Sequence, residues 1–226
     1  GKRSIAMNLK HPDAVSAFRE LVKKVDVIVD PFRPGVMEKM GLGPDVLCAD
    51  NPRLIFARMT GWGQSGDPDY VYAAGHDANY IAISGSLDLF RREDERPLPP
   101  GNFAGDYAGG GVMLAMGVLL SIIERGKSGK GQVIDVAMTE GANYVALPLI
   151  KWMQPGGILP TMPDGRLDAS RSTLHQAPHW SNTYKCKCGG YVSVQSMEPQ
   201  FYAIMIKGLG LDASTLPHQY DHTSWP

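Results

Sequence analysis

Residues 12–29 read PDAVSAFRELVKKVDVIV, and this stretch decides the fold. Apolar side chains recur at helical spacing through its first part, which predicts a helix from Pro12 to Val25. The β-branched run from Val25 to Val29 then predicts a strand. A helix that leads directly into a strand is a building unit of α/β proteins, in which helices pack on the faces of a sheet.

The same alternation continues along the chain. Prolines, glycines and β-branched runs mark the boundaries of the next elements. In order, the sequence predicts a helix at 36–40, a helix from 44, a strand at 54–59, an exposed loop at 91–100, a helix at 105–123 and a strand at 132–137. This alternation favours a parallel sheet covered on both faces, a Rossmann-like arrangement, for roughly the first 150 residues.

The remainder of the chain differs in composition. Residues 154–173 are rich in Pro, Gly, Asp and Ser, which is typical of a linker. A strand at 190–195 and a helix at 199–208 are expected after it. The domains that we expect are a Rossmann-like large domain at 1–153, a linker at 154–185 and the beginning of a smaller α+β domain at 186–226.

Composition argues against several classes of protein. The chain has 226 residues, 43% hydrophobic and 20% charged, with a formal net charge of -1, which is unlike a general binder of nucleic acid or membrane surfaces. The apolar run from Val112 to Ile123 is too short to span a bilayer and predicts a buried helix. Cys186 and Cys188 are too close in sequence for the usual zinc spacing, so no metal site is expected.

One histidine and one aspartate stand in glycine-rich segments. His76 lies in GHDANY, residues 75–80, and Asp106 lies in NFAGDYAGGG, residues 102–111. An imidazole and a carboxylate, each beside backbone that a ligand can approach closely, can remove a proton from one face of a carbon and return one to the other face. The alternative is that both are structural, with His76 an ordinary loop histidine and Asp106 an N-cap of the helix that follows.

These two motifs resemble those of the alpha-methylacyl-CoA racemases, within the class III CoA-transferase superfamily. The resemblance extends over nearly the whole chain. The further segments that carry it are GKRSIAMNLK at 1–10, PFRPGVME at 31–38, NPRLIFAR at 51–58, GWGQSG at 61–66, GKGQVID at 129–135 and EPQFY at 198–202. By the same resemblance, we expect the chain to be truncated at both ends.

The resemblance implies a racemase or epimerase that interconverts (2R)- and (2S)-2-methylacyl-CoA thioesters through an enolate. It implies that His76 and Asp106 are the two bases, one on each face of the 2-methylacyl group. It also implies an interlocked homodimer, in which Glu198 reaches the catalytic histidine of the partner subunit. The backbone N–H of Asp77, next to the histidine, is our candidate donor to the enolate oxygen.

The resemblance also implies which residues bind CoA. The residues that it places along the CoA are Met7, Asn8, Leu9 and Lys10. Those that it places beside the pantetheine and thioester are Gly75, His76, Asp77, Ala78, Asn79 and Tyr80. The cations available for its phosphates are Lys2, Arg3, Lys10, Arg33 and Arg58. No separate cofactor is expected, because CoA is part of the substrate. Members of this family act on branched fatty acyl-CoAs and bile-acid intermediates in peroxisomes and mitochondria.

Two other functions stay open. In a class III CoA-transferase, the carboxylate at Asp106 would attack the acyl-CoA and carry the acyl group as a mixed anhydride. Alternatively, the chain is an inactive, truncated paralogue that binds CoA. The chain departs from the racemase pattern at two places. Asn8 replaces a usual aspartate, which bears on the expected CoA contact, and His175 to Trp180 replace a Gly-Gly-Ala-Pro-Phe-Tyr segment, which bears on the acyl pocket and on activity.

Overall fold

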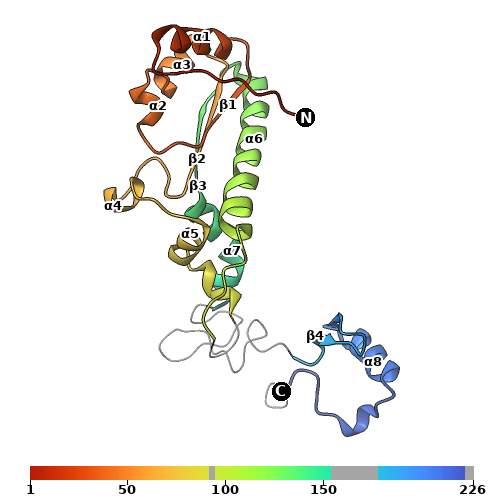
Figure 1. Ribbon diagram of the computed structural model, residues 1–226. Helices are drawn as coiled ribbons and strands as arrows, with labels where there is room; N and C mark the ends of the chain where they lie inside the picture. The colour runs from red at the N-terminus through yellow and green to blue at the C-terminus, as the bar shows by residue number, and fades with distance from the viewer. Residues whose placement is uncertain (92–94, 154–177, 222–226) are drawn as a thin grey trace. The chain divides into compact units, whose positions relative to one another are not determined.

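The computed structural model describes residues 1–91, 95–153 and 178–221 (Figure 1). Two compact units divide the chain. The first comprises residues 1–90 and 98–147, and the second comprises residues 91–97 and 148–226.

The first unit is built on a parallel sheet in the order β1-β2-β3. The strands are β1 (Val27–Asp30), β2 (Ile55–Thr60) and β3 (Val133–Ala137). Register pairs Ile28 with Phe56 and Phe56 with Val133. The parallel α/β arrangement predicted from the sequence is therefore confirmed.

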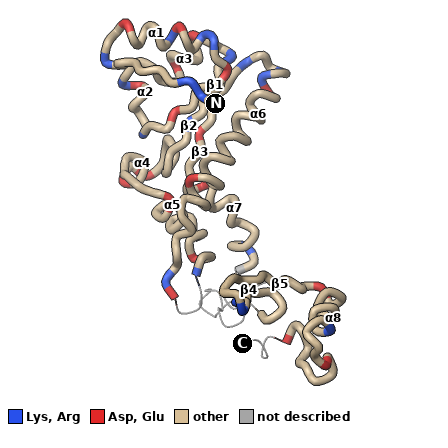
Figure 2. The backbone as a smooth tube through the Cα atoms, turned by 45° about the vertical axis from the view of Figure 1, so that its right-hand side comes forward, with Lys and Arg blue, Asp and Glu red and all other residues tan. Residues whose placement is uncertain are grey.

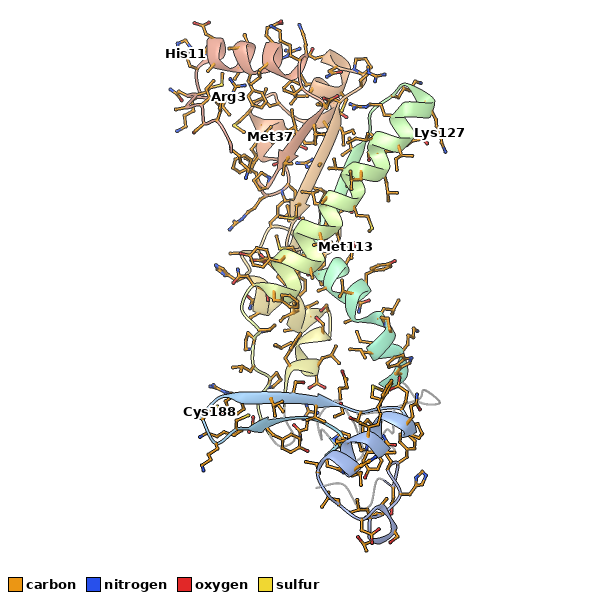
Figure 3. All side chains as sticks on the ribbon, turned by 90° about the vertical axis from the view of Figure 1, so that its right-hand side faces the viewer. Arg3, His11, Met37, Met113, Lys127 and Cys188 are labelled. Atoms are coloured by element: carbon orange, nitrogen blue, oxygen red, sulfur yellow. The ribbon has the colours of Figure 1, made fainter. Side chains whose placement is uncertain are left out.

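Helices precede, connect and follow these strands. Several begin at a proline, because the N–H that proline lacks would have no partner within the helix. In chain order they are α1 (Pro12–Val22), α2 (Val36–Lys39), α3 (Pro44–Asp50), α4 (Pro68–Val71), α5 (Asp77–Ile83), the 3-10 helix η1 (Ser86–Phe90), the π-helix η2 (Phe103–Val112), α6 (Met113–Ser128) and α7 (Met138–Met153). The helix expected at 105–123 is thus divided into a π-helical part and an α-helical part, and Figure 3 labels Met113 at their junction.

Alternate side chains of the strands pack into two separate hydrophobic cores, because successive side chains point to opposite faces of a sheet. Phe56 belongs to one core with residues of α1, α2 and α3, whereas Ala57 belongs to the other with Leu114 of α6. Figure 1 shows α6 running along the strands. Ion pairs add to the packing of these helices. Arg19 Nε and Nη2 donate to the two carboxyl oxygens of Asp50 at 2.6 and 2.8 Å, and Arg125 Nη2 lies 2.9 Å from Asp26 Oδ1.

The structure corrects the expectation that Val112 to Ile123 form a buried helix. Within α6 only Leu114 and Ser121 are buried, while Leu119, Leu120 and Ile123 are 61%, 58% and 60% exposed. The tube of α6 is mostly tan in Figure 2, without charge along most of its length. Residues 103–128 together are long and apolar enough to cross a membrane, but the packing of Leu114 on the sheet shows a helix that belongs to the first unit.

The second unit contains a hairpin and a helix. Strands β4 (Ser181–Lys185) and β5 (Tyr191–Gln195) pair antiparallel, α8 (Pro199–Gly208) follows, and the 3-10 helix η4 (Ala213–Thr215) comes last. Cys188 lies at the tip of the hairpin (Figure 3). Because β4 falls in the stretch expected as a linker, ordered structure of this unit begins before residue 186. Residues 154–177 of that expected linker lie outside the described residues.

Candidate active site

His76 stands at the start of α5. It is the N-cap residue, with extended backbone at φ -133 and ψ 170, and its side chain is exposed. Its own N–H donates to Asn79 Oδ1 at 3.0 Å, which closes the first turn. The N–H of the next residue, Asp77, makes no hydrogen bond within the described part of the chain. An exposed imidazole thus lies one residue from an unpaired backbone donor.

Tyr80 holds the peptide that precedes the histidine. Its hydroxyl donates to the Gly75 carbonyl, and its ring packs edge-on against Trp62 at a centroid distance of 4.9 Å. A Cβ at Gly61 or Gly75 would overlap the Tyr80 ring, so both positions require glycine. Burial, and then the charge of the Asp106 carboxylate, raise the pKa of Tyr80, whereas Arg33 lowers it. Tyr80 is therefore a neutral donor near physiological pH.

Asp77 links α5 to η2. Its side chain is buried, at 4% exposure, and Oδ2 accepts the backbone N–H groups of Gly105 at 2.7 Å and Asp106 at 2.8 Å. These are first-turn donors of η2, which have no partner inside their own helix. Asp106 is therefore not the N-cap that the structural alternative required, since Asn102 occupies that position and the capping oxygen comes from Asp77.

Asp106 itself is half-buried in the first turn of η2. Asn102 Nδ2 donates to its Oδ2 at 2.5 Å, which orients the carboxyl group. The following glycines let η2 cross close to α7, because a Cβ at Gly109 would lie 2.5 Å from the backbone nitrogen of Ala142. The structure thus brings the Asp106 and His76 segments side by side through Asp77.

A cleft of about 340 Å³ lies beside α5 in the first unit. Its walls combine polar and apolar groups, and they include a guanidinium, an imidazole and the Tyr80 ring. The residues that line it are Pro31, Arg33, Pro34, Met59, Thr60, Gly61, Trp62, Val71, Ala73, Ala74, Gly75, His76, Tyr80 and Met138. It opens near the carboxyl ends of β1 and β2, where ligands of parallel α/β sheets commonly bind.

The expected CoA-binding cations fall into different environments. Arg33 is exposed and lines the cleft, while Lys2, Arg3 and Lys10 are exposed on the N-terminal segment, where Figure 3 labels Arg3. In Figure 2 the backbone tube near the N-terminus is blue where Lys and Arg residues occur. Asn8 accepts the Lys10 N–H at 3.2 Å through its side chain, and Leu9 packs on the first core. Met7, Asn8, Leu9 and Lys10 are not among the residues that line the cleft.

Arg58 corrects the expected pool of cations. Its side chain is 6% exposed, its Nε pairs with Asp30 Oδ2 at 3.1 Å, and its Nη1 donates to Glu38 Oε1 at 2.6 Å. Both carboxyl groups would have to be displaced before a CoA phosphate could bind this guanidinium. Arg58 therefore holds β2 to β1 and α2, and we remove it from the CoA-binding residues.

Glu198 lies in the second unit as the exposed N-cap residue of α8. Its approach to the histidine of a partner subunit stays a prediction. The second unit has its own cleft, of about 630 Å³, with walls that are almost entirely apolar. His179 lines it and lies 3.0 Å from the Tyr202 hydroxyl, and burial lowers the pKa of this histidine.

Trp180 shows what part of the divergent segment does. Its ring is 4% exposed, and Nε1 donates to the Gln219 carbonyl at 2.9 Å. Trp180 is therefore part of the core of the second unit. Residues 175–177 of the segment lie outside the described residues.

Comparison with known proteins decides the family. The sequence profile of CoA-transferase family III matches residues 1–224. The chain belongs to this family. Alpha-methylacyl-CoA racemases of Mus musculus and Homo sapiens are each 44% identical over 232 residues, covering 100% of this chain and 57% of each racemase. The chain thus spans little more than half the length of these family III enzymes.

Other members of the family are similar over shorter stretches or at lower identity. The succinyl-CoA–L-malate CoA-transferase beta subunit of Chloroflexus aurantiacus is 41% identical over 140 residues, 62% of this chain and 34% of that subunit. A CAIB/BAIF family protein from Brucella suis superposes with a TM-score of 0.77 at 25% identity, covering 99% of this chain and 57% of that one. The hypothetical protein Rv3272 from Mycobacterium tuberculosis gives 0.74 at 26%, with the same coverage.

Sequence reasoning missed three side chains of this site. Asp77 was expected beside the pantetheine and as a backbone N–H donor, with no role for its carboxyl group, and Trp62 and Asn102 were given no role. The usable signal for Asp77 was an aspartate at the first position of a helix, with a glycine before Asp106 that leaves room for a carboxyl oxygen. A Cβ at Gly105 would lie 2.8 Å from Asp77 Oδ2.

Proposed function

We propose that the protein containing this chain is a racemase that interconverts (2R)- and (2S)-2-methylacyl-CoA thioesters. One observation carries the proposal: Asp77, the residue after His76, hydrogen-bonds the backbone of Asp106. An imidazole segment and a carboxylate segment are thereby held side by side. The identity of 44% to two alpha-methylacyl-CoA racemases over the whole chain supports the same activity.

The reaction uses the two side chains in turn. For one isomer, His76 accepts the α-proton, the C–H bonding electrons pass into the enolate, and protonated Asp106 delivers a proton to the opposite face. For the other isomer, Asp106 is the base and the protonated histidine is the acid. We propose the free N–H of Asp77 as the donor to the enolate oxygen, where a fixed donor stabilises charge that develops in the transition state.

Binding of CoA would use the cleft and the exposed cations. Arg33 is a cation on the cleft wall near His76, and Lys2, Arg3 and Lys10 are exposed for the phosphates. We propose that Met7, Asn8 and Leu9 lie along the CoA, and that Gly75 to Tyr80 face the pantetheine and thioester. The proposed route needs no group beyond the protein and its substrate.

An interlocked homodimer is part of the proposal. The exposed apolar side chains of α6, including Leu119, Leu120 and Ile123, form the kind of surface that proteins cover by association. In such a dimer Glu198 would bind the histidine of the partner subunit and orient its ring. The exposed position of Glu198 at the start of α8 is compatible with this role.

A CoA-transferase is the second candidate. Its support is the identity of 41% to the Chloroflexus aurantiacus transferase subunit over 140 residues. In that reaction Asp106 would attack the thioester carbonyl, release CoA thiolate and hold the acyl group as an anhydride. This route gives no role to a second base in His76, so the histidine in the cleft favours the racemase.

The test follows (2R)- and (2S)-2-methylacyl-CoA separately in D2O with the protein as naturally expressed. The racemase predicts deuterium at the α-carbon together with inversion from either isomer. Hydroxylamine is added in a parallel sample with a carboxylic acid acceptor. Acyl hydroxamate formation at Asp106 without inversion would identify a transferase, and binding of CoA without either reaction would identify an inactive paralogue.

A further inference from the structure

We propose that Asp77 is a positioning residue that sets the relation of the two bases, an inference that rests on the proposed racemase function. The Asp77 carboxyl group is attached to the residue that follows His76, and its Oδ2 accepts the N–H of Asp106 at 2.8 Å. One short side chain therefore connects the backbone of one base to the backbone of the other. It touches neither reacting atom, and it acts only through the segments that it joins.

The environment of Asp77 supports a role beyond ordinary helix capping. The side chain is 4% exposed, and its Oδ1 is buried with no hydrogen-bond partner among the described residues. A buried oxygen without a hydrogen-bond partner destabilises the folded state. The two hydrogen bonds at Oδ2 must offset this loss, and they are the contacts that fix the backbone of Asp106.

Gly105 is fitted to the same contact. Its N–H donates to Asp77 Oδ2 at 2.7 Å, and a Cβ at this position would come within 2.8 Å of that oxygen. A side chain at Gly105 must therefore push the carboxyl group away from the Gly105 and Asp106 N–H groups. The position of the Asp77 carboxyl group therefore depends on a glycine at residue 105.

Three variants separate the roles of Asp77. Asp77→Ala removes the link, Asp77→Asn keeps an oxygen that can accept both N–H groups, and Gly105→Ala keeps the carboxyl group but displaces it. Asp50→Ala is the matched control. Asp50 also accepts two N–H donors in the first unit, from Arg19 at 2.6 and 2.8 Å, but it joins α1 to α3.

The first readout compares exchange with inversion in D2O. In Asp77→Ala, Asp106 shifts while His76 stays in its cleft. We expect inversion to fall about 100-fold, because a displacement near 1 Å can have that effect on a positioned group. Exchange with retention persists for the one isomer whose α-proton faces His76, so its exchange-to-inversion ratio rises at least about 10-fold while KM changes less than about 3-fold.

Other outcomes are equally informative. Gly105→Ala reproduces the raised ratio, Asp77→Asn restores inversion to within about 10-fold of the unmodified protein, and Asp50→Ala leaves the ratio unchanged. A parallel fall of exchange and inversion for both isomers in Asp77→Ala would show general structural damage and would overturn the proposal. If Asp77→Ala does not fold, an equal exchange-to-inversion ratio in Gly105→Ala and Asp77→Asn would overturn the proposal.

The second readout does not depend on catalysis. Amide hydrogen exchange at Gly105 and Asp106 speeds up in Asp77→Ala and Gly105→Ala and stays slow in Asp77→Asn and Asp50→Ala. Unchanged protection in Asp77→Ala would refute the link itself. Absence of inversion in the unmodified protein, with protection lost in Asp77→Ala, would instead refute the racemase and, with it, the positioning of two bases while leaving the backbone contact established.

Discussion

The two units of the chain each contain a cleft, and the clefts are built on opposite principles. In the first unit, polar side chains of α5, the helix that contributes Tyr80 to the cleft, bond to backbone, as Tyr80 does to Gly75 and Asp77 does to Asp106. In the second unit the larger cleft has apolar walls from α8 and β5, such as Ile206 and Val194. Backbone held by specific hydrogen bonds suits chemistry at a fixed distance, whereas an apolar wall offers burial without direction.

The largest expected effect is a loss of stability in the first unit alone, caused by the removal of a buried charge. Arg58→Ala leaves Asp30 buried without its cation, so we expect a loss of about 3–5 kcal/mol in the free energy of unfolding of the first unit. Amide exchange should speed up in β1 to β3 and stay unchanged in β4 and β5. Arg33→Ala is the control, because its exposed side chain should affect acyl-CoA binding and not folding. Equal stability losses in the two variants would contradict the buried role of Arg58.

A second variant probes the other unit. Trp180→Ala removes a ring that is 4% exposed and a hydrogen bond to Gln219, and such truncations cost about 3 kcal/mol or more. Protection in β4 and β5 should fall while β1 to β3 keep theirs. Tyr191→Ala, at a β5 position that is 73% exposed, should change little. Loss of protection in both units together would show that they fold as one.

A smaller effect tests the close crossing of η2 and α7. A Cβ on Gly141 would overlap the Gly109 carbonyl oxygen, so Gly141→Ala should destabilise the first unit by about 1–3 kcal/mol and displace Asp106. Gly126→Ala, in α6 with open space around it, should instead stabilise by up to about 1 kcal/mol. Thermal unfolding measures both. A neutral Gly141→Ala would mean that the crossing is loose.

The smallest effect depends on pH. The hydrogen bond from Arg58 holds the pKa of Glu38 below its ordinary value. Because the pKa is lower in the folded state, the stabilisation is present above the ordinary pKa and is lost as pH falls through the folded one. Glu38→Gln should cost less than about 1 kcal/mol at pH 7, since this carboxylate is 43% exposed. The difference from the unmodified protein should disappear as the pH falls below the ordinary glutamate pKa of 4.5 and through the lower pKa of Glu38 in the folded protein. A constant difference would rule out the ion pair as its source.

Much of the first unit was predictable from sequence, because local patterns specify its elements. The β-branched run at Val27 predicts a strand, the alternation of helices and strands predicts a parallel sheet, and the motifs around His76 and Asp106 indicate the family. The contact of Asp77 was not predictable, since it joins residues 28 and 29 positions apart. Arg58 was assigned to CoA for the same reason, because its partners Asp30 and Glu38 reach it only through the packing of β1 and α2 on β2.

The expectation for α6 failed for a related physical reason. An apolar run predicts burial, but burial needs a covering surface, and the sheet covers only the side of α6 that carries Leu114. Leu120 and Ile123 stay exposed within the described chain. Sequence reports the tendency of a side chain to leave water, and tertiary or quaternary structure decides where it goes.

The most direct test of the two-base site resolves exchange by isomer in two variants. With His76→Ala and Asp106→Ala in D2O, the account predicts that inversion is lost in both. Each variant should keep α-deuterium exchange for one isomer only, and the two variants should keep opposite isomers. Loss of exchange from both isomers in both variants, or retention of the same isomer in each, would contradict two bases on opposite faces of the substrate.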